Sequence, residues 1–80
     1  MSPATRTKAH KRLVSLLTEA RRRTGLRQAE VAKKLGRSQA WMSRIEHGEH
    51  RIDVIEFHRL ALLFGLDPHR LIARIWRELD

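Results

Sequence analysis

The chain has 80 residues, a formal net charge of +8 and no cysteine. This length supports one small domain with a modest core and excludes two domains. The lack of cysteine excludes a disulfide framework and a thiolate zinc site. No apolar run approaches the roughly 18 residues that are needed to cross a bilayer, so membrane insertion is not expected.

The positive charge is concentrated in the first part of the chain. Residues 1–51 contain 13 Lys and Arg against 4 Asp and Glu, whereas residues 52–80 contain 4 against 5. A basic part beside a nearly neutral one favours an anionic partner such as nucleic acid. Residues 1–8 lack the apolar centre of a signal peptide and are interpreted as a flexible basic arm, able to follow a DNA backbone or minor groove.

Three short helices are predicted in the basic part, and each is followed by a glycine. Apolar residues at helical spacing indicate the first helix over residues 7–23 and the second over residues 28–35. The third helix begins after Ser38, a good N-cap, and runs to residue 46 or 47.

Two more helices are predicted in the neutral part. Asp53 and Glu56 have the spacing of a capping box ahead of a fourth helix, which ends at Gly65. Asp67 and Pro68 then open a fifth helix. Short connections and the lack of any strand pattern predict an all-α domain.

The predicted architecture is a compact five-helix bundle, with residues 9–66 as the main domain and residues 67–80 as a C-terminal helix. The last helix carries more apolar surface than one small monomer needs. It is therefore interpreted as a dimer interface, and closure of the monomer core is the alternative. The residues concerned are Leu71, Ile72, Ile75, Trp76 and Leu79.

The third helix has an apolar and a polar face. Met42 and Ile45 are three residues apart and point toward the core. At about 100° per residue the opposite face is formed by Ala40, Ser43, Arg44 and His47, with Gln39 and Trp41 on the flanks. A helix with small and hydrogen-bonding side chains on its free face fits a DNA major groove.

The stretch GLRQAEVAKKLGRSQAWMSRIEHGEHRI, residues 25–52, resembles the helix-turn-helix of Cro and phage-repressor type regulators, the XRE family. The resemblance covers about residues 9–72. It implies sequence-specific binding of double-stranded DNA by a cytoplasmic, nucleoid-associated transcriptional regulator. A homodimeric repressor or autoregulator with a palindromic operator is expected, without enzyme activity or cofactor. No metal site is expected either, because His47 and His50 lack a third ligand nearby.

The resemblance also implies roles for single residues. Gln39 and Arg44 are expected to read base edges, with Ser43 at a base or phosphate, and Gln28 is expected to bind a phosphate. Chemistry matches Gln39 to adenine, Arg44 to guanine and the methyl group of Ala40 to thymine. Further phosphate contacts are expected from Arg27, Ser38, Trp41 and Arg51, and a structural ion pair from Arg21 and Glu46.

Two positions depart from the family pattern. Arg27 stands where a Thr or Ser usually caps the second helix, and its side chain cannot accept hydrogen bonds from the exposed amides. Trp41 stands where a small polar residue is frequent. Its indole N–H is interpreted as a phosphate donor with the ring over a sugar or methyl group, and packing against the second helix is the alternative.

A second functional hypothesis stays open from the sequence. An antitoxin or adaptor of the same fold would present its C-terminal helix to a partner protein such as a toxin. Such a protein and a DNA-binding autoregulator are not exclusive.

Overall fold

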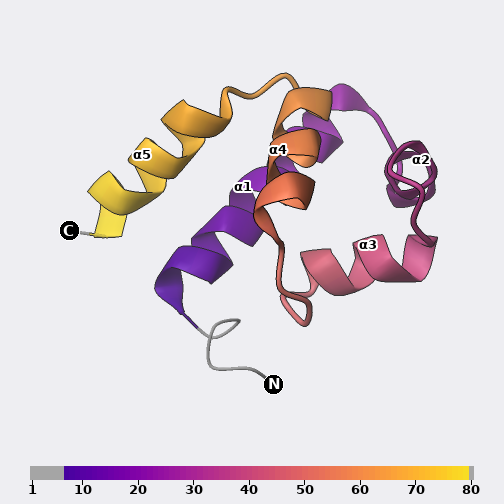
Figure 1. Ribbon diagram of the computed structural model, residues 1–80, viewed down its shortest axis with the longest axis horizontal. Helices are drawn as coiled ribbons and strands as arrows, with labels where there is room; N and C mark the ends of the chain where they lie inside the picture. The colour runs from indigo at the N-terminus through magenta and orange to yellow at the C-terminus, as the bar shows by residue number, and fades with distance from the viewer. Residues whose placement is uncertain (1–6, 80) are drawn as a thin grey trace.

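The computed structural model describes residues 7–79, which fold into five α-helices with short connections (Figure 1). No strand occurs among these residues, so the predicted all-α bundle is confirmed. The helices are α1 (Lys8–Thr24), α2 (Gln28–Lys34), α3 (Gln39–Glu46), α4 (Val54–Leu63) and α5 (Pro68–Leu79). Of the predicted arm, residues 1–6 lie outside the described residues, and Lys8 belongs to the first turn of α1.

Side-chain caps explain where the helices begin. The Ser38 hydroxyl accepts a hydrogen bond from the Trp41 backbone N–H at 3.1 Å, and the Asp53 carboxylate accepts one from the Glu56 N–H at 2.7 Å. Each cap satisfies a backbone donor that has no partner inside the helix. These local contacts fix the starts of α3 and α4 independently of the rest of the fold.

The turn between α2 and α3 depends on Gly36, which has a φ of +70°. A Cβ built there meets no atom within 4 Å, so a larger residue is opposed by backbone conformation alone. We expect Gly36→Ala to lower the free energy of unfolding by about 1–2 kcal/mol, and Gly36→Asn by less, since Asn tolerates this conformation. Urea unfolding measures both changes in stability. An Ala variant as stable as the wild type would show that the turn does not depend on glycine at position 36.

The core is built around α1, which runs through the middle of the molecule with α3 and α5 on opposite sides (Figure 1). The largest fully buried side chains of the core come from α1, α2, α3 and α4, namely Leu17, Val31, Met42, Ile45 and Leu60. The apolar face of α3 is therefore anchored in the core, and its polar face is left free.

Among the five helices, none combines the length and the apolar composition that a membrane span requires.

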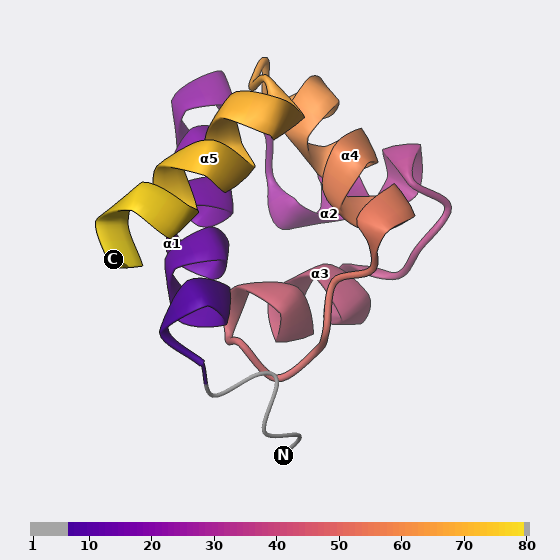
Figure 2. The same cartoon turned by 60° about the vertical axis from the view of Figure 1, so that its left-hand side comes forward.

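The C-terminal helix α5 lies across α1 (Figure 2) and completes the core. Leu71 and Ile75 are 7% and 3% exposed, and Leu79 packs against the same cluster. The prediction of a dimer interface made of all five apolar residues of this helix is therefore contradicted for Leu71 and Ile75, which are buried in the chain's own core, as the alternative of core closure proposed. Ile72 and Trp76, 40% and 58% exposed, point elsewhere.

The carboxylate of Glu78 joins α5 to α1. It accepts hydrogen bonds from Arg12 Nε at 2.5 Å and from Arg74 Nε at 2.9 Å. These two contacts, that of Arg12 first, lower the pKa of Glu78 from 4.5 to about 2. The carboxylate thus stays ionised in the folded chain at a pH where it is already protonated in the unfolded chain.

This pKa difference predicts an acid-dependent part of the stability. A carboxyl group with a lowered pKa stabilises the fold above pH 4.5, and this contribution is lost as the pH falls from 4.5 to about 2. We expect Glu78→Gln to reduce the loss of stability across this interval, and salt to weaken the effect because the group is exposed. Urea unfolding at a series of pH values checks this, and equal slopes for both proteins would contradict it.

Candidate nucleic-acid interface

α2 and α3 pack directly against each other and are joined by a tight turn. The Arg37 backbone N–H donates to the Ala32 carbonyl oxygen at 2.8 Å and closes this turn. With Met42 and Ile45 buried, α3 exposes a face that includes Gln39, Ala40, Arg44 and His47, and Ser43 is half-buried. The surface predicted to read base edges is therefore open to solvent.

A chain of polar contacts links α1, α2 and α3. Arg21 on α1 and Glu46 at the end of α3 form a two-point ion pair, with Nε to Oε2 at 2.6 Å and Nη2 to Oε1 at 3.0 Å. Gln28 at the start of α2 donates from Nε2 to Glu46 Oε1 at 2.8 Å. Gln39 at the start of α3 then donates from Nε2 to Gln28 Oε1 at 2.9 Å. We call Arg21, Glu46, Gln28 and Gln39 the polar chain.

The inner end of the polar chain is shielded from water, and its outer end is exposed. The side chains of Arg21 and Glu46 are 12% and 7% exposed, whereas Gln39 lies at the surface. Arg21 also donates from Nη1 to the Leu26 carbonyl oxygen at 2.9 Å, which holds the loop before α2. A buried ion pair thus fixes the surface position of two glutamines.

The polar chain also determines which atoms of the glutamines stay available. One N–H of each side-chain amide is used inside the chain, so Gln28 retains one N–H for an outside acceptor. Gln39 retains one N–H and its Oε1. A donor beside an acceptor is the pattern that pairs with N7 and N6 of adenine in the major groove.

The start of α2 lacks a side-chain cap, as the sequence predicts from Arg27. The Glu30 carboxylate instead accepts from the Arg27 backbone N–H at 3.1 Å and from its Nε at 3.0 Å. These two hydrogen bonds, the backbone one first, lower the pKa of Glu30. The guanidinium of Arg27 is therefore held beside the first turn of α2 while it remains exposed.

Two serines proposed to face DNA have partners within the fold. Ser38 caps α3 through its oxygen, and within residues 7–79 its hydroxyl proton has no acceptor. His47 Nδ1 lies 2.7 Å from the carbonyl oxygen of Ser43 and 3.3 Å from its Oγ. Because a carbonyl oxygen only accepts, Nδ1 carries the proton that joins His47 to Ser43.

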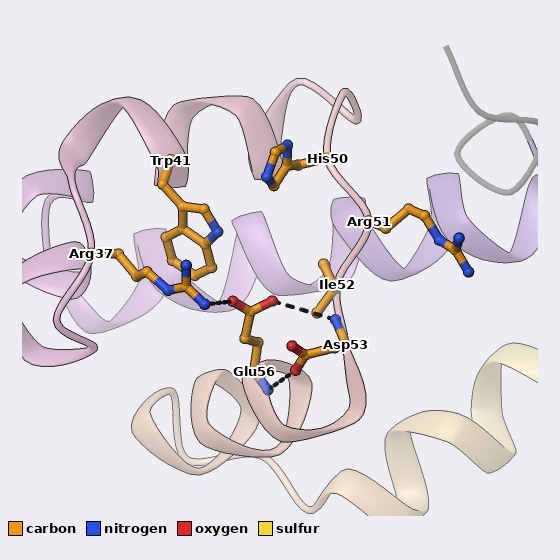
Figure 3. Close-up of a pocket in the computed structure, with 7 residues that line it drawn as sticks. All are labelled: Arg37, Trp41, His50, Arg51, Ile52, Asp53 and Glu56. Atoms are coloured by element: carbon orange, nitrogen blue, oxygen red, sulfur yellow. Dashed lines mark hydrogen bonds and ion pairs between the residues drawn. The ribbon is translucent and has the colours of Figure 1, made fainter.

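A surface hollow of about 280 Å³ lies where the turn before α3 meets the loop before α4 (Figure 3). The guanidinium of Arg37 lies over the Trp41 ring, 5.3 Å from its centroid, and donates to Glu56 at 2.6 Å. Glu56 also accepts a hydrogen bond from the Asp53 backbone N–H at 3.4 Å. α4 is thereby attached to the turn that precedes the exposed face of α3.

The surface position predicted for the Trp41 ring is wrong, because the residue is only 6% exposed and belongs to the buried cluster that includes Val31 and Ala32 of α2, in agreement with the alternative of packing against the second helix. The Trp41 side chain nevertheless lines the hollow, and its indole nitrogen points toward the middle of the hollow (Figure 3). The guanidinium of Arg51 extends away from Trp41 and Glu56 (Figure 3). The two proposed phosphate contacts Trp41 and Arg51 therefore do not lie together.

The charge of Arg51 also acts on His10 of α1. Burial first, and then this charge, lower the pKa of His10.

Comparison with known proteins identifies this arrangement. A family model described as a helix-turn-helix domain matches residues 12–73. The solved structure of an XRE-family like protein from Pseudomonas syringae pv. tomato str. DC3000 superposes with a TM-score of 0.82 at 38% identity, covering 90% of this chain and 88% of that one. The chain belongs to the XRE-type helix-turn-helix family of DNA-binding transcription regulators.

A phage protein shows similarity to the same XRE-type domain. The ImmF control region 10 kDa protein of Bacillus phage phi105 is 37% identical over 57 residues, which is 71% of this chain. The aligned part spans 63% of the length of the phage protein. The similarity therefore concerns the domain rather than the whole of that protein.

Two features of this XRE-type domain were not predicted from its sequence. Glu56 was interpreted only as half of a capping box, but it also accepts the ion pair from Arg37. The hydrogen bond from Gln28 to Glu46 joins residues 18 positions apart. The only sequence signal for either was opposite charge or amide chemistry at helix ends, which does not select one partner among many.

Proposed function

We propose that this XRE-type protein is a repressor or autoregulator that reads an inverted repeat in double-stranded DNA as a homodimer. The polar chain carries the proposal, because it presents Gln39 on the free face of α3 with a defined donor and acceptor. The phage relative is named as a control region protein, which supports a role in gene control.

In the proposed complex the free face of α3 enters the major groove. Gln39 pairs with adenine through its remaining N–H and Oε1, and Arg44, exposed and without an ion pair among residues 7–79, pairs with guanine. Ala40 offers a methyl group to thymine, and Ser43 contacts a base or a phosphate. These contacts select sequence because each base pair displays a distinct pattern in this groove.

A second set of residues is proposed to bind the phosphate backbone without reading sequence. Gln28 donates its second N–H and Ser38 its hydroxyl proton, because neither proton has a partner among residues 7–79. Arg27 and Arg51 add exposed charge, and the indole N–H of Trp41 adds a donor from the hollow. Together they fix the depth and register of α3 in the groove.

Gln28→Ala tests the polar chain as a functional unit. We expect about tenfold weaker binding to every duplex, from the lost phosphate contact, and a further loss at the base read by Gln39, whose amide loses its support. The Gln28→Ala and Gln39→Ala effects should therefore not add in a double-mutant cycle. Binding titrations on a preferred duplex, the same duplex with that base pair changed and a random duplex measure this. Strict additivity would contradict the coupling.

A further inference from the structure

A carboxylate of α4 holds the side chain of Arg37. Arg37 lies in the turn directly before Ser38, the N-cap of α3, and its Nη2 donates to Glu56 Oε2 at 2.6 Å. The guanidinium also lies over the Trp41 ring. Figure 3 shows it directed across the hollow toward Glu56. The cation nearest in sequence to the start of α3 is therefore neutralised within the fold.

Glu56 is oriented by its own helix before it meets Arg37. Its Oε1 accepts from the Asp53 backbone N–H at 3.4 Å, and its own backbone N–H donates to the Asp53 carboxylate at 2.7 Å. This capping box leaves Oε2 for Arg37. The side chain of Glu56 is 14% exposed, whereas that of Arg37 is 49% exposed. The pair therefore combines a fixed, largely buried acceptor with a long, half-exposed donor.

A DNA phosphate at the start of α3 has to compete with Glu56 for Arg37. The proposed phosphate donors Ser38 and Trp41 lie beside Arg37, one as the next residue and the other in the same hollow. To bind a phosphate there, the guanidinium has to leave Glu56, and a largely buried carboxylate then remains without its cation. The gain is small, because one anionic acceptor only replaces another. The fold therefore favours the ion pair over the phosphate contact.

The ion pair at the start of α2 behaves differently. Arg27 pairs with Glu30 of the same helix, and their side chains are 84% and 43% exposed. A phosphate can replace Glu30 at low cost, because water solvates the released carboxylate. Arg27 thus stays available to DNA, whereas Arg37 is retained by the fold.

We propose that Glu56 is a positioning residue for DNA binding, which keeps Arg37 off the phosphate backbone. Its effect is to remove one phosphate contact from the basic surface, which limits the affinity and the salt dependence of binding that does not read sequence. Base reading by α3 is not affected, because a phosphate contact carries no sequence information. The inference rests on the proposed function, since it assumes that the start of α3 faces the DNA backbone.

The salt dependence of binding to a random duplex tests the proposal with the full chain. The logarithm of the affinity falls with the logarithm of the salt concentration, with a slope of about 0.9 for each neutralised phosphate. Glu56→Gln keeps an acceptor for the Asp53 N–H but removes the charge that holds Arg37. We expect this slope to become steeper by about 0.9, and the affinity at physiological salt to rise roughly fivefold. The ratio of affinities for a preferred and a random duplex should not change.

Three further variants isolate the contribution of Arg37. Arg37→Gln alone should keep the wild-type slope, because this residue makes no phosphate contact while Glu56 holds it. The double variant Arg37→Gln with Glu56→Gln should return to the wild-type slope, because no cation is released. The control is Glu49→Gln, which removes a negative charge from the exposed loop after α3, where Glu49 has no ion pair among residues 7–79. It should leave the slope unchanged.

Circular dichroism on the same samples confirms that each variant is folded. A wild-type slope for Glu56→Gln, or a change that Glu49→Gln reproduces, would overturn the proposal. So would a slope that Arg37→Gln makes shallower by about 0.9, because Arg37 would then bind a phosphate in spite of Glu56.

The same experiment separates this inference from the proposed function. If the wild type selects a DNA sequence but Glu56→Gln leaves the slope unchanged, base reading stands and only the role of Glu56 fails. If Glu56→Gln steepens the slope as expected but the wild type selects no sequence, the role of Glu56 is supported and the proposed function is contradicted. A wild-type protein that binds no DNA would overturn both.

Discussion

Replacing Glu46 by Ala is expected to lower the free energy of unfolding by about 3–5 kcal/mol, a large part of the stability of a domain this small. The substitution leaves the guanidinium of Arg21 only 12% exposed and without its carboxylate. It also removes the acceptor of Gln28. Urea unfolding followed by circular dichroism measures the change, and the same samples report whether the five helices still form.

The chain contains a matched control for this prediction. Glu19 pairs with Arg23 on the same helix, but their side chains are 53% and 75% exposed, so Glu19→Ala should cost at most about 0.5 kcal/mol. Glu46→Gln, which keeps an acceptor but loses the charge, should fall between the two. Equal effects of Glu46→Ala and Glu19→Ala would show that the buried ion pair does not hold α3 in place.

Replacing Arg44 by Ala is expected to abolish base preference at one position of each half-site. A good bidentate contact to guanine contributes about 1–3 kcal/mol of discrimination, which is roughly 5- to 150-fold in relative affinity. Arg44 is exposed and has no ion pair among residues 7–79, so the folded stability should change little. Binding titrations against the preferred duplex and its single-base-pair variants give the preference at each position.

Lys34→Ala is the control for Arg44→Ala because it removes the same charge from the exposed end of α2. It should weaken binding to all duplexes by a similar factor and reduce the dependence of affinity on salt. If Arg44→Ala also weakened all duplexes by one common factor, Arg44 would bind a phosphate and its assigned role would be wrong.

The order and bounds of the helices were predictable from the sequence because their signals are local. Ser38 and Asp53 cap the helices that follow them, and the glycine at each of the four turns has a positive φ. A cap or a turn is decided by a few neighbouring residues. Such features can be predicted without any knowledge of tertiary packing.

The role of α5 was harder to predict because tertiary packing decides it. Apolar residues occupy two adjacent stripes of this helix, one through Leu71 and Ile75 and one through Ile72 and Trp76. Periodicity shows that the helix is amphipathic but not which stripe α1 covers. The five residues were therefore grouped as one interface, whereas the structure divides them between the core and the surface.

The candidate interface was predictable as a set of residues but not as a network. The spacing of Met42 and Ile45 correctly leaves the opposite face of α3 open, whereas Trp41 turned out to be buried. The contacts among Gln28, Gln39 and Glu46 depend on the approach of α2 and α3, which no local pattern encodes. The sequence therefore names the side chains, and the structure shows how they are oriented.

The central claim is that α3 reads DNA sequence, and selection from a pool of randomised duplexes tests it most directly. The full chain is incubated with the pool at physiological salt and excess competitor DNA, and the retained duplexes are sequenced. We predict an enriched inverted repeat whose half-sites are about one helical turn apart and contain adenine and guanine for Gln39 and Arg44. Retention without enrichment of any sequence would contradict this claim, because the protein would then bind only the DNA backbone.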